Sequence, residues 1–168
     1  MRRALVLLAG LSLGGCVYYN GVYNAQRLTK EAERAERDGR RLEAQGLYGR
    51  VASKAESVVV RYPRSEWVDD ARFLRGNAFA RMRNCAGGRA DLEVVAYGSP
   101  DPKLARRALD VLADCYSELG EWDHAAAALT RLRGESDPAV RRRAAERLVA
   151  ALRANGRYHE ALAVMEAD

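Results

Sequence analysis

Histidine, lysine and aromatic residues are scarce in this chain of 168 residues. Its two histidines are His124 and His159, and they lack partners at the spacing of metal ligands. We therefore expect no metal site and no cofactor. Aromatic residues make up only 7% of the chain, and acidic and basic residues are interspersed. Nucleic-acid interfaces gather basic side chains on one face, with aromatics between them, so we expect no nucleic-acid partner.

A catalytic constellation is also missing from the pattern. No set of serine, histidine and aspartate stands out, and the glycine pairs Gly14–Gly15 and Gly87–Gly88 do not form phosphate loops. Neighbouring acids such as Asp69 and Asp70 suit the start of a helix better than acid–base chemistry. The sequence therefore predicts a protein that is not an enzyme and has no small-molecule substrate.

The composition favours a folded, helical domain. Hydrophobic residues make up 48% and charged residues 30%, with much alanine, leucine, arginine and glutamate. The net charge of +5 includes two arginines within the first three residues. The densest basic run is Arg141-Arg142-Arg143, with Arg147 one turn later. It is interpreted as the solvated face of a helix, and the alternative is a patch for an anionic partner or lipid headgroups.

The first sixteen residues have the pattern of an export signal. Met1-Arg2-Arg3 is basic, residues 4–13 are apolar, and the apolar stretch is too short for a spanning helix. The segment Leu13-Gly14-Gly15-Cys16 resembles the lipobox of bacterial lipoproteins. That resemblance implies a signal peptide over residues 1–15 and a lipid-modified Cys16. The alternative is an ordinary signal peptide with a chance cysteine.

The resemblance also implies a location. In lipoproteins of bacteria with two membranes, an aspartate after the cysteine favours the inner membrane, so Val17 implies the periplasmic face of the outer membrane. In a cell with a single membrane the anchor would lie in the cell membrane. Residues 16–24 would form a tether with three tyrosines, which suit the membrane–water interface or pack on the first helix.

Landmarks recur in the rest of the chain at a nearly constant step. Residues 119–125, Leu-Gly-Glu-Trp-Asp-His-Ala, return 36 positions later as Asn-Gly-Arg-Tyr-His-Glu-Ala. The four prolines also follow this step, and each lies where a helix would begin or end. We expect caps at the following helices from Ser65, Ser99, Asp101 and Asp137.

These features resemble the tetratricopeptide repeat, a helix–turn–helix unit of about 34 residues. The resemblance implies an all-α solenoid of about four repeats over residues 25–168. The third and fourth repeats match best. The second departs at Arg75 and at residues 84–88, and the first has a long second helix over residues 40–60. In the last helix we expect Leu162 and Met165 to pack inward. The outer edge then stays open to another protein or a second copy, unless the short last helix covers it.

Residues 61–71, Arg-Tyr-Pro-Arg-Ser-Glu-Trp-Val-Asp-Asp-Ala, narrow the resemblance. They are similar to a junction of BamD-like lipoproteins, which are outer-membrane lipoproteins built from these repeats, and whose type member helps to insert β-barrel proteins. This chain is shorter than that type member. Under the repeat alignment, Cys85 and Cys115 end neighbouring first helices, which implies a disulfide between them. The alternative is two small buried thiols.

The first helices of such repeats line a groove that binds partner segments. The mapped groove positions are mixed in charge, which suits a polar segment more than a purely hydrophobic one. The alternative is a solvated groove that binds no partner. They are Asp70, Phe73, Asn77, Arg81, Arg107, Asp110, Asp114, Ser117, Glu118, Arg143, Glu146, Ala150 and Arg153.

The expected function is that of a membrane-anchored periplasmic lipoprotein that acts as a scaffold for other envelope proteins, including a role in outer-membrane protein assembly. The alternatives are a coordinator of cell division or transport and a non-catalytic accessory subunit of an envelope enzyme. These alternatives differ in which proteins bind the chain.

Overall fold

The computed structural model describes the backbone of residues 2–167 and the side chains of residues 20–167. The regular structure of this described part is entirely α-helical, which confirms the all-α prediction. The chain forms two compact units, Met1–Arg83 and Asn84–Asp168. The described helices are α1 (Arg2–Arg37), α2 (Arg41–Arg61), α3 (Val68–Arg81), α4 (Cys85–Gly98), α5 (Pro102–Glu118), α6 (Trp122–Arg133), α7 (Pro138–Ala154) and α8 (Tyr158–Ala167).

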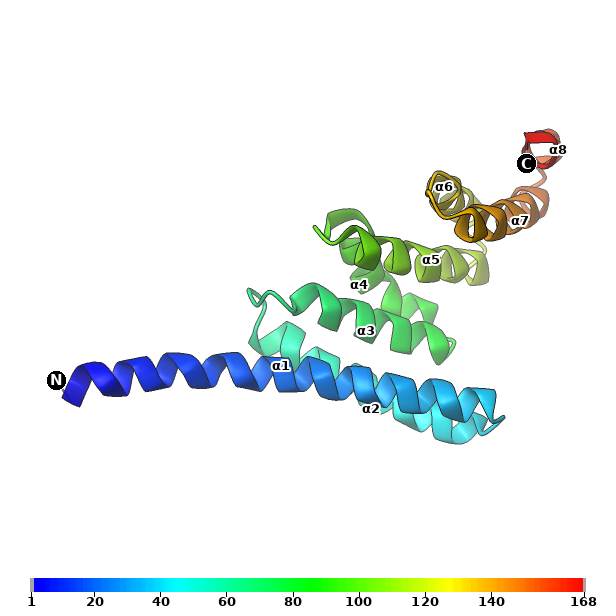
Figure 1. Ribbon diagram of the computed structural model, residues 1–168. Helices are drawn as coiled ribbons and strands as arrows, with labels where there is room; N and C mark the ends of the chain where they lie inside the picture. The colour runs from blue at the N-terminus through cyan, green and yellow to red at the C-terminus, as the bar shows by residue number, and fades with distance from the viewer. Residues whose placement is uncertain (1, 168) are drawn as a thin grey trace. The chain divides into compact units, whose positions relative to one another are not determined.

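Unit 1 consists of α1, α2 and α3, which lie side by side (Figure 1). Small and branched apolar residues recur every three or four positions on α1 and α2, and they form the core of this unit. The fully buried members include Ala25, Ala32, Ala35 and Ala55. Alanine permits a close approach of two helix backbones. The larger Tyr48 fills the space between the helices and is only 1% exposed.

The packed part of α1 begins before residue 25. Val22 is 1% exposed and belongs to the core of unit 1. A Cβ atom at Gly21 would lie 2.7 Å from Cγ2 of Val58, so the small residue is needed for the contact with α2. The end of the predicted tether, residues 16–24, is therefore part of a packed helix. Tyr23 points away from this core and is exposed.

The junction between α2 and α3 is irregular. Helix α2 ends at Arg61, ahead of Pro63, and its length confirms the long helix predicted over residues 40–60. Ser65 was expected to cap the next helix, and this prediction is wrong. The residue before α3 is Trp67, and the buried Ser65 Oγ has no hydrogen-bond partner. The backbone N–H of Ser65 instead bonds to the carbonyl of Tyr62, which closes a turn.

Unit 2 consists of α4 to α8, which form successive helical hairpins (Figure 1). Asp101 and Asp137 cap α5 and α7, as predicted: each carboxylate accepts a hydrogen bond of 2.9 Å from a backbone N–H two residues on. Ser99 was also expected to cap a helix start, and this prediction is wrong. Ser99 is extended and ends α4, and the cap falls to Asp101 because Pro102 begins the helix.

One turn recurs along the chain. Gly120 and Gly156 end α5 and α7 in the left-handed region, with φ of +74° and +75°, which favours glycine. The residue after each glycine donates its N–H back to a carbonyl five positions earlier. Gly39 forms the same turn after α1. Arg83 stands 37 residues before Gly120 and also has a positive φ, of 62°.

Candidate partner-binding surfaces

The groove residues predicted from the sequence lie on three helices. Helix α3 in unit 1 carries Asp70, Phe73, Asn77 and Arg81. The others are in unit 2, where α5 carries Arg107, Asp110, Asp114, Ser117 and Glu118, and α7 carries Arg143, Glu146, Ala150 and Arg153.

In unit 1, Arg81 is engaged with the neighbouring helices. Its guanidinium pairs with Glu36 on α1 and lies 6.0 Å from the centre of the Tyr48 ring. The Tyr48 hydroxyl also donates to Glu36, at 3.0 Å. Burial is the main reason why the pKa of Tyr48 rises to about 12. Asn77 and Arg81 line a hollow of about 460 Å³ together with residues of α1. Phe73 is buried, so it is not an open contact.

In unit 2, the predicted groove residues of α5 and α7 pair with one another. Asp110 accepts hydrogen bonds from Arg143 at 2.8 Å and from Arg147 at 2.5 Å. Arg147 also donates to the Asp114 carboxylate, at 2.6 Å. Ser117 donates to the carbonyl of Ala113 in its own helix. Charges that were expected to face a partner are therefore partly used to hold α7 on α5.

Arg147 was placed in a solvated basic run by sequence reasoning, and this placement is wrong. Its side chain is 25% exposed and joins two carboxylates of α5. The residues of the basic run point in different directions from α7. Arg143 also faces α5. Arg141 donates to the backbone carbonyls of Glu135 and Ser136. The sequence pattern that could have predicted these ion pairs is the spacing of one helical turn between Arg143 and Arg147. The same spacing separates Asp110 and Asp114.

A second polar cluster joins α4, α5 and α6. Arg89 donates to Glu93 at 2.8 Å and to Glu121 at 2.6 Å, and its guanidinium lies 5.4 Å from the centre of the Tyr116 ring. The Tyr116 hydroxyl donates to Glu93 at 2.9 Å. The ring of His124 stacks on Tyr116, with 5.1 Å between centroids. This cluster was not predicted from the sequence. The only part of it that the sequence indicates is the Arg89–Glu93 pair, whose members lie one helical turn apart.

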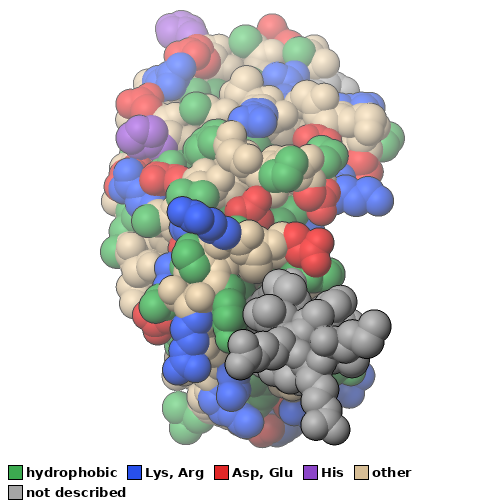
Figure 2. Space-filling view, turned by 90° about the vertical axis from the view of Figure 1, so that its left-hand side faces the viewer, with side chains coloured by type: hydrophobic (Ala, Val, Ile, Leu, Met, Phe, Trp, Pro, Cys, Tyr) green, Lys and Arg blue, Asp and Glu red, His purple; other side chains and the backbone are tan. Residues whose placement is uncertain are grey.

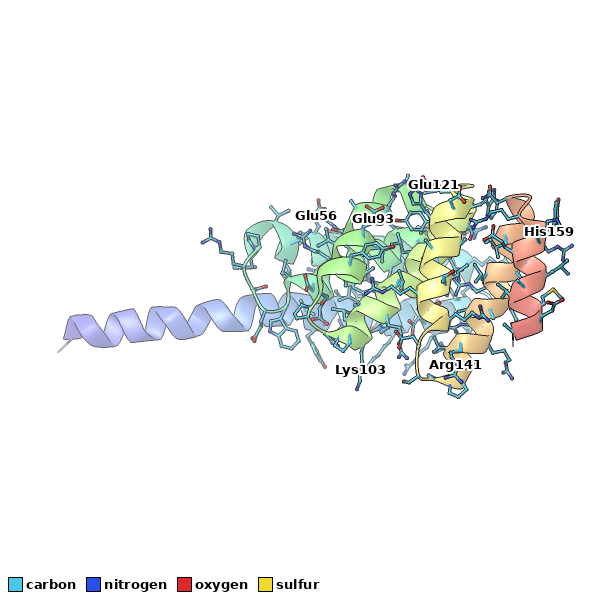
Figure 3. The ribbon with its side chains drawn as sticks, turned by 90° about the horizontal axis from the view of Figure 1, so that it is seen from above. Glu56, Glu93, Lys103, Glu121, Arg141 and His159 are labelled. Atoms are coloured by element: carbon cyan, nitrogen blue, oxygen red, sulfur yellow. A yellow bond between two sulfur atoms is a disulfide. The ribbon has the colours of Figure 1, made fainter. Side chains whose placement is uncertain are left out.

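Figure 3 shows Glu93 and Glu121 at one edge of unit 2, and Lys103 and Arg141 at the opposite edge. Burial opposes the ionisation of Glu93, but the hydrogen bonds from Arg89 and Tyr116 outweigh it and hold the pKa of Glu93 below its usual value. Burial, together with the bond to Glu93, raises the pKa of Tyr116. The cluster is therefore an ionised carboxylate held between an arginine and a neutral tyrosine, and it contributes to the contact between helices.

Cys85 and Cys115 are joined by a disulfide in the structure, with Cα atoms 5.1 Å apart. Cys85 was expected at the end of a first helix, and this placement is wrong. It is the first residue of α4, because Asn84 caps that helix by accepting a hydrogen bond from the N–H of Gly87. Cys115 lies near the end of α5, as expected, and both cysteines are buried. The bond therefore links the start of α4 to α5.

An open apolar groove lies between α7 and α8. It encloses about 590 Å³ and is lined by Pro138, Arg141, Arg142, Ala145, Glu146, Val149, Val164 and Met165. The expectation that Leu162 and Met165 pack inward is wrong: they are 55% and 62% exposed. Ala161, one residue before Leu162, is the buried residue of α8. Tyr158 is on the same exposed stripe, at 62%.

The remaining site predictions concern charge, metals and the anchor. Figure 2 shows acidic and basic side chains intermingled on the visible face. His124 and His159 are exposed, and no group of residues suited to a metal ion occurs among the described side chains. None of the helices, in their described portions, has an apolar stretch that could cross a membrane. The side chain of Cys16, the predicted lipidation site, lies outside the described residues.

No protein-family model matches the chain, and neither the curated proteins nor the solved structures contain a significant match.

Proposed function

We propose that this chain is a non-catalytic lipoprotein of the bacterial envelope, anchored through Cys16, whose helical hairpins bind other envelope proteins. The hairpins are proposed to be tetratricopeptide repeats, and the chain is proposed to resemble BamD-like outer-membrane lipoproteins in its organisation. The proposed location is the periplasmic face of the outer membrane.

The observation that carries the proposal is the recurring helical hairpin. Gly120 and Gly156 form the same left-handed turn 36 residues apart, and each is followed by an aromatic residue two positions later. Helical pairs that repeat at this interval expose faces for contact with protein segments. A scaffold needs no reactive group, only a shaped and charged surface.

The anchor is supported by the sequence around Cys16. A basic start, a short apolar stretch and two glycines precede the cysteine. Each buried methylene of an attached acyl chain contributes about 0.8 kcal/mol, so several chains together hold a protein firmly on a membrane. The disulfide between Cys85 and Cys115 is consistent with an oxidising compartment, since such bonds are rare in the cytosol.

The anchor is tested with a Cys16→Ala variant. We expect the wild-type chain in the carbonate-washed membrane pellet and the variant in the soluble periplasmic fraction. Labelling with a radioactive fatty acid should mark the wild type but not the Cys16→Ala variant. A Cys85→Ser/Cys115→Ser variant is the matched control, because it changes cysteines without removing the anchor. A variant at Cys16 that still pellets quantitatively contradicts the proposed anchor.

The scaffold role is tested by crosslinking the tagged, membrane-bound chain in living cells and identifying what co-purifies. Recovery of β-barrel assembly components would support the role in outer-membrane assembly. Recovery of division, cell-wall or transport proteins would favour the alternative roles and contradict the assembly role. Failure of the chain to crosslink to any envelope protein contradicts the scaffold function itself.

A further inference from the structure

We propose that the face formed by α7 and α8 is a site for a second copy of this chain, with the two α7 helices antiparallel about a two-fold axis. The proposal goes beyond the scaffold function and does not depend on the lipid anchor. It rests on two exposed charges of opposite sign and on the apolar surface that surrounds them.

The two charges are Arg142 and Glu146, which line the groove between α7 and α8. Both are exposed, and neither forms an ion pair or hydrogen bond with any side chain that the structure describes. They lie one turn apart on the same helix. A basic residue that precedes the acid is the less favourable order for a pair within a helix, because it opposes the helix dipole. Both groups are therefore available to a partner.

This arrangement is complementary to itself. When a second α7 lies antiparallel to the first, with the axis midway between residues 142 and 146, each Arg142 faces the Glu146 of the other copy. Two ion pairs form at once from one pair of residues. Two-fold contacts of this kind, in which the same patch serves both subunits, are the commonest form of oligomer.

Apart from Arg141, the groove around the two charges is lined by apolar residues. Ala145, Val149, Val164 and Met165 line the groove, and the groove encloses about 590 Å³. The same axis brings Val149 of each copy toward the Pro138 end of the other α7. Tyr158, Leu162 and Met165 form an exposed stripe on α8, each at least 55% exposed. Contiguous apolar surface with a polar rim is typical of protein interfaces.

Within one chain, ion pairs between residues one turn apart also link α5 and α7, although these two helices run in the same direction and the contact is not two-fold. Asp110 and Asp114 on α5 receive Arg143 and Arg147, which lie one turn apart on α7. Glu146 stands 36 residues after Asp110, so it occupies the corresponding position on the next helix of this type. In the second copy, Arg142 supplies the base that Arg147 supplies to Asp110. The outward face of α7 thus keeps the acid at the position of Asp110, while Ala150 stands where Asp114 would recur.

The test is sedimentation equilibrium of the full chain in a density-matched detergent. We expect the wild type to be a dimer at micromolar concentration. Arg142→Glu and Glu146→Arg each place like charges opposite one another twice, so each should raise the dissociation constant by about tenfold or more. Arg50→Glu, on an exposed position of α2, is the matched control and should leave it unchanged.

Restoration distinguishes this interface from a general loss of folding. The double variant Arg142→Glu/Glu146→Arg recreates both ion pairs, as does an equimolar mixture of the two single variants. Both should recover the wild-type dissociation constant to within about threefold, and circular dichroism should show unchanged helix content. The proposal is overturned by a wild type that stays monomeric up to about 100 μM, by single variants without effect, or by a double variant and mixture that fail to recover.

Discussion

Single residues at the turns control how each hairpin closes. At Gly120 the backbone has a φ of +74°, a region in which the Cβ of any other residue crowds the following carbonyl. No atom lies within 4 Å of a Cβ built there, so the cost of a substitution is conformational and not steric contact with another helix. The same holds for Gly156.

We therefore expect Gly120→Ala to lower the free energy of unfolding of unit 2 by about 1 kcal/mol. Gly49 is the matched control, because it lies inside α2 with open space around it and no positive φ. Gly49→Ala should raise stability by about 0.5–1 kcal/mol, since alanine loses less backbone entropy in a helix. Urea unfolding followed by circular dichroism measures both. Equal effects of the two changes would contradict this account of the turn.

The low pKa of Glu93 makes a prediction about acid stability. A carboxylate with a lower pKa in the folded state stabilises the fold above its unfolded pKa, and that contribution is lost as the pH falls through the folded pKa. We expect Glu93→Gln to reduce stability at pH 7 by up to about 1 kcal/mol. We also expect a smaller difference from the wild type at pH 3.

Thermal unfolding at the two pH values measures this effect. Glu166→Gln is the control, because Glu166 is exposed and makes no ion pair within the described residues. A Glu93→Gln variant whose deficit is as large at pH 3 as at pH 7 would show that the Glu93 contribution is not electrostatic.

Residue-level prediction from the sequence succeeded where chemistry acts locally. Asp101 and Asp137 were predicted as caps because an aspartate accepts a hydrogen bond from the first backbone N–H groups of a helix and a proline suits the first helical position. Ser65 and Ser99 failed because a serine also suits turns and helix ends, and the neighbouring residues decide among these. The left-handed backbone conformation of Arg83 was not predicted, because this conformation is expected from the sequence mainly at glycine and asparagine.

At the scale of helices, ion pairs link α7 to α5. Asp110 holds two arginines, and one of them, Arg147, is only 25% exposed. Removing the carboxylate would leave a half-buried guanidinium with a weaker set of partners. The side chain of Arg143 is 59% exposed, so water can solvate Asp110 in its place when Arg143 is removed.

We expect Asp110→Asn to destabilise unit 2 by about 1–3 kcal/mol. The control Arg143→Ala should cost at most about 0.5 kcal/mol. A double-mutant cycle of Asp110→Asn with Arg147→Met isolates the coupling between the two side chains. Additive single effects would mean that the pair contributes nothing to the packing of α7.

The disulfide is the covalent contact between α4 and α5. It joins positions 30 residues apart, so the chain-entropy model gives about 3–4 kcal/mol of stabilisation. We expect the Cys85→Ser/Cys115→Ser variant to lose about this amount in urea unfolding, and the wild type to lose it on reduction. Mass mapping of protein isolated from the periplasm, under non-reducing conditions, should find the two residues in one linked peptide pair. Two free thiols would contradict the bond.

The sequence predicted the helices themselves better than it predicted the roles of single residues. Glycines, prolines and caps marked most helix ends, and the long α2 was visible as an unbroken helical pattern. The inward face of α8 was not predicted correctly, because a ten-residue helix with apolar residues at 158, 161–165 and 167 has two candidate faces. Which face of α8 turns inward depends on the angle between α7 and α8. The turn at Gly156 sets this angle, and the residue pattern of α8 does not reveal it.

For the molecule as a whole, the division into two units is the feature that the sequence pattern concealed. The recurring step predicted one continuous domain over residues 25–168, because a periodic pattern has no visible boundary. The structure divides the chain after Arg83. Unit 1 has its own core around Tyr48, and unit 2 has its own disulfide and its own buried residues on α5 and α7.

Two units with separate cores should lose structure separately. The Cys85→Ser/Cys115→Ser variant weakens unit 2 alone, so we expect hydrogen exchange of α4 and α5 to accelerate on the order of 100-fold, which corresponds to about 3 kcal/mol. Peptides from α1, α2 and α3 should exchange as in the wild type. Hydrogen exchange with mass spectrometry of the oxidised full chain and of the variant compares both units in one sample. The acceleration follows from opening of the unit that holds the bond, since exchange of a buried amide requires its helix to unfold. Equal acceleration in the peptides of both units would show that they unfold together, and the division would then describe their packing but not their stability.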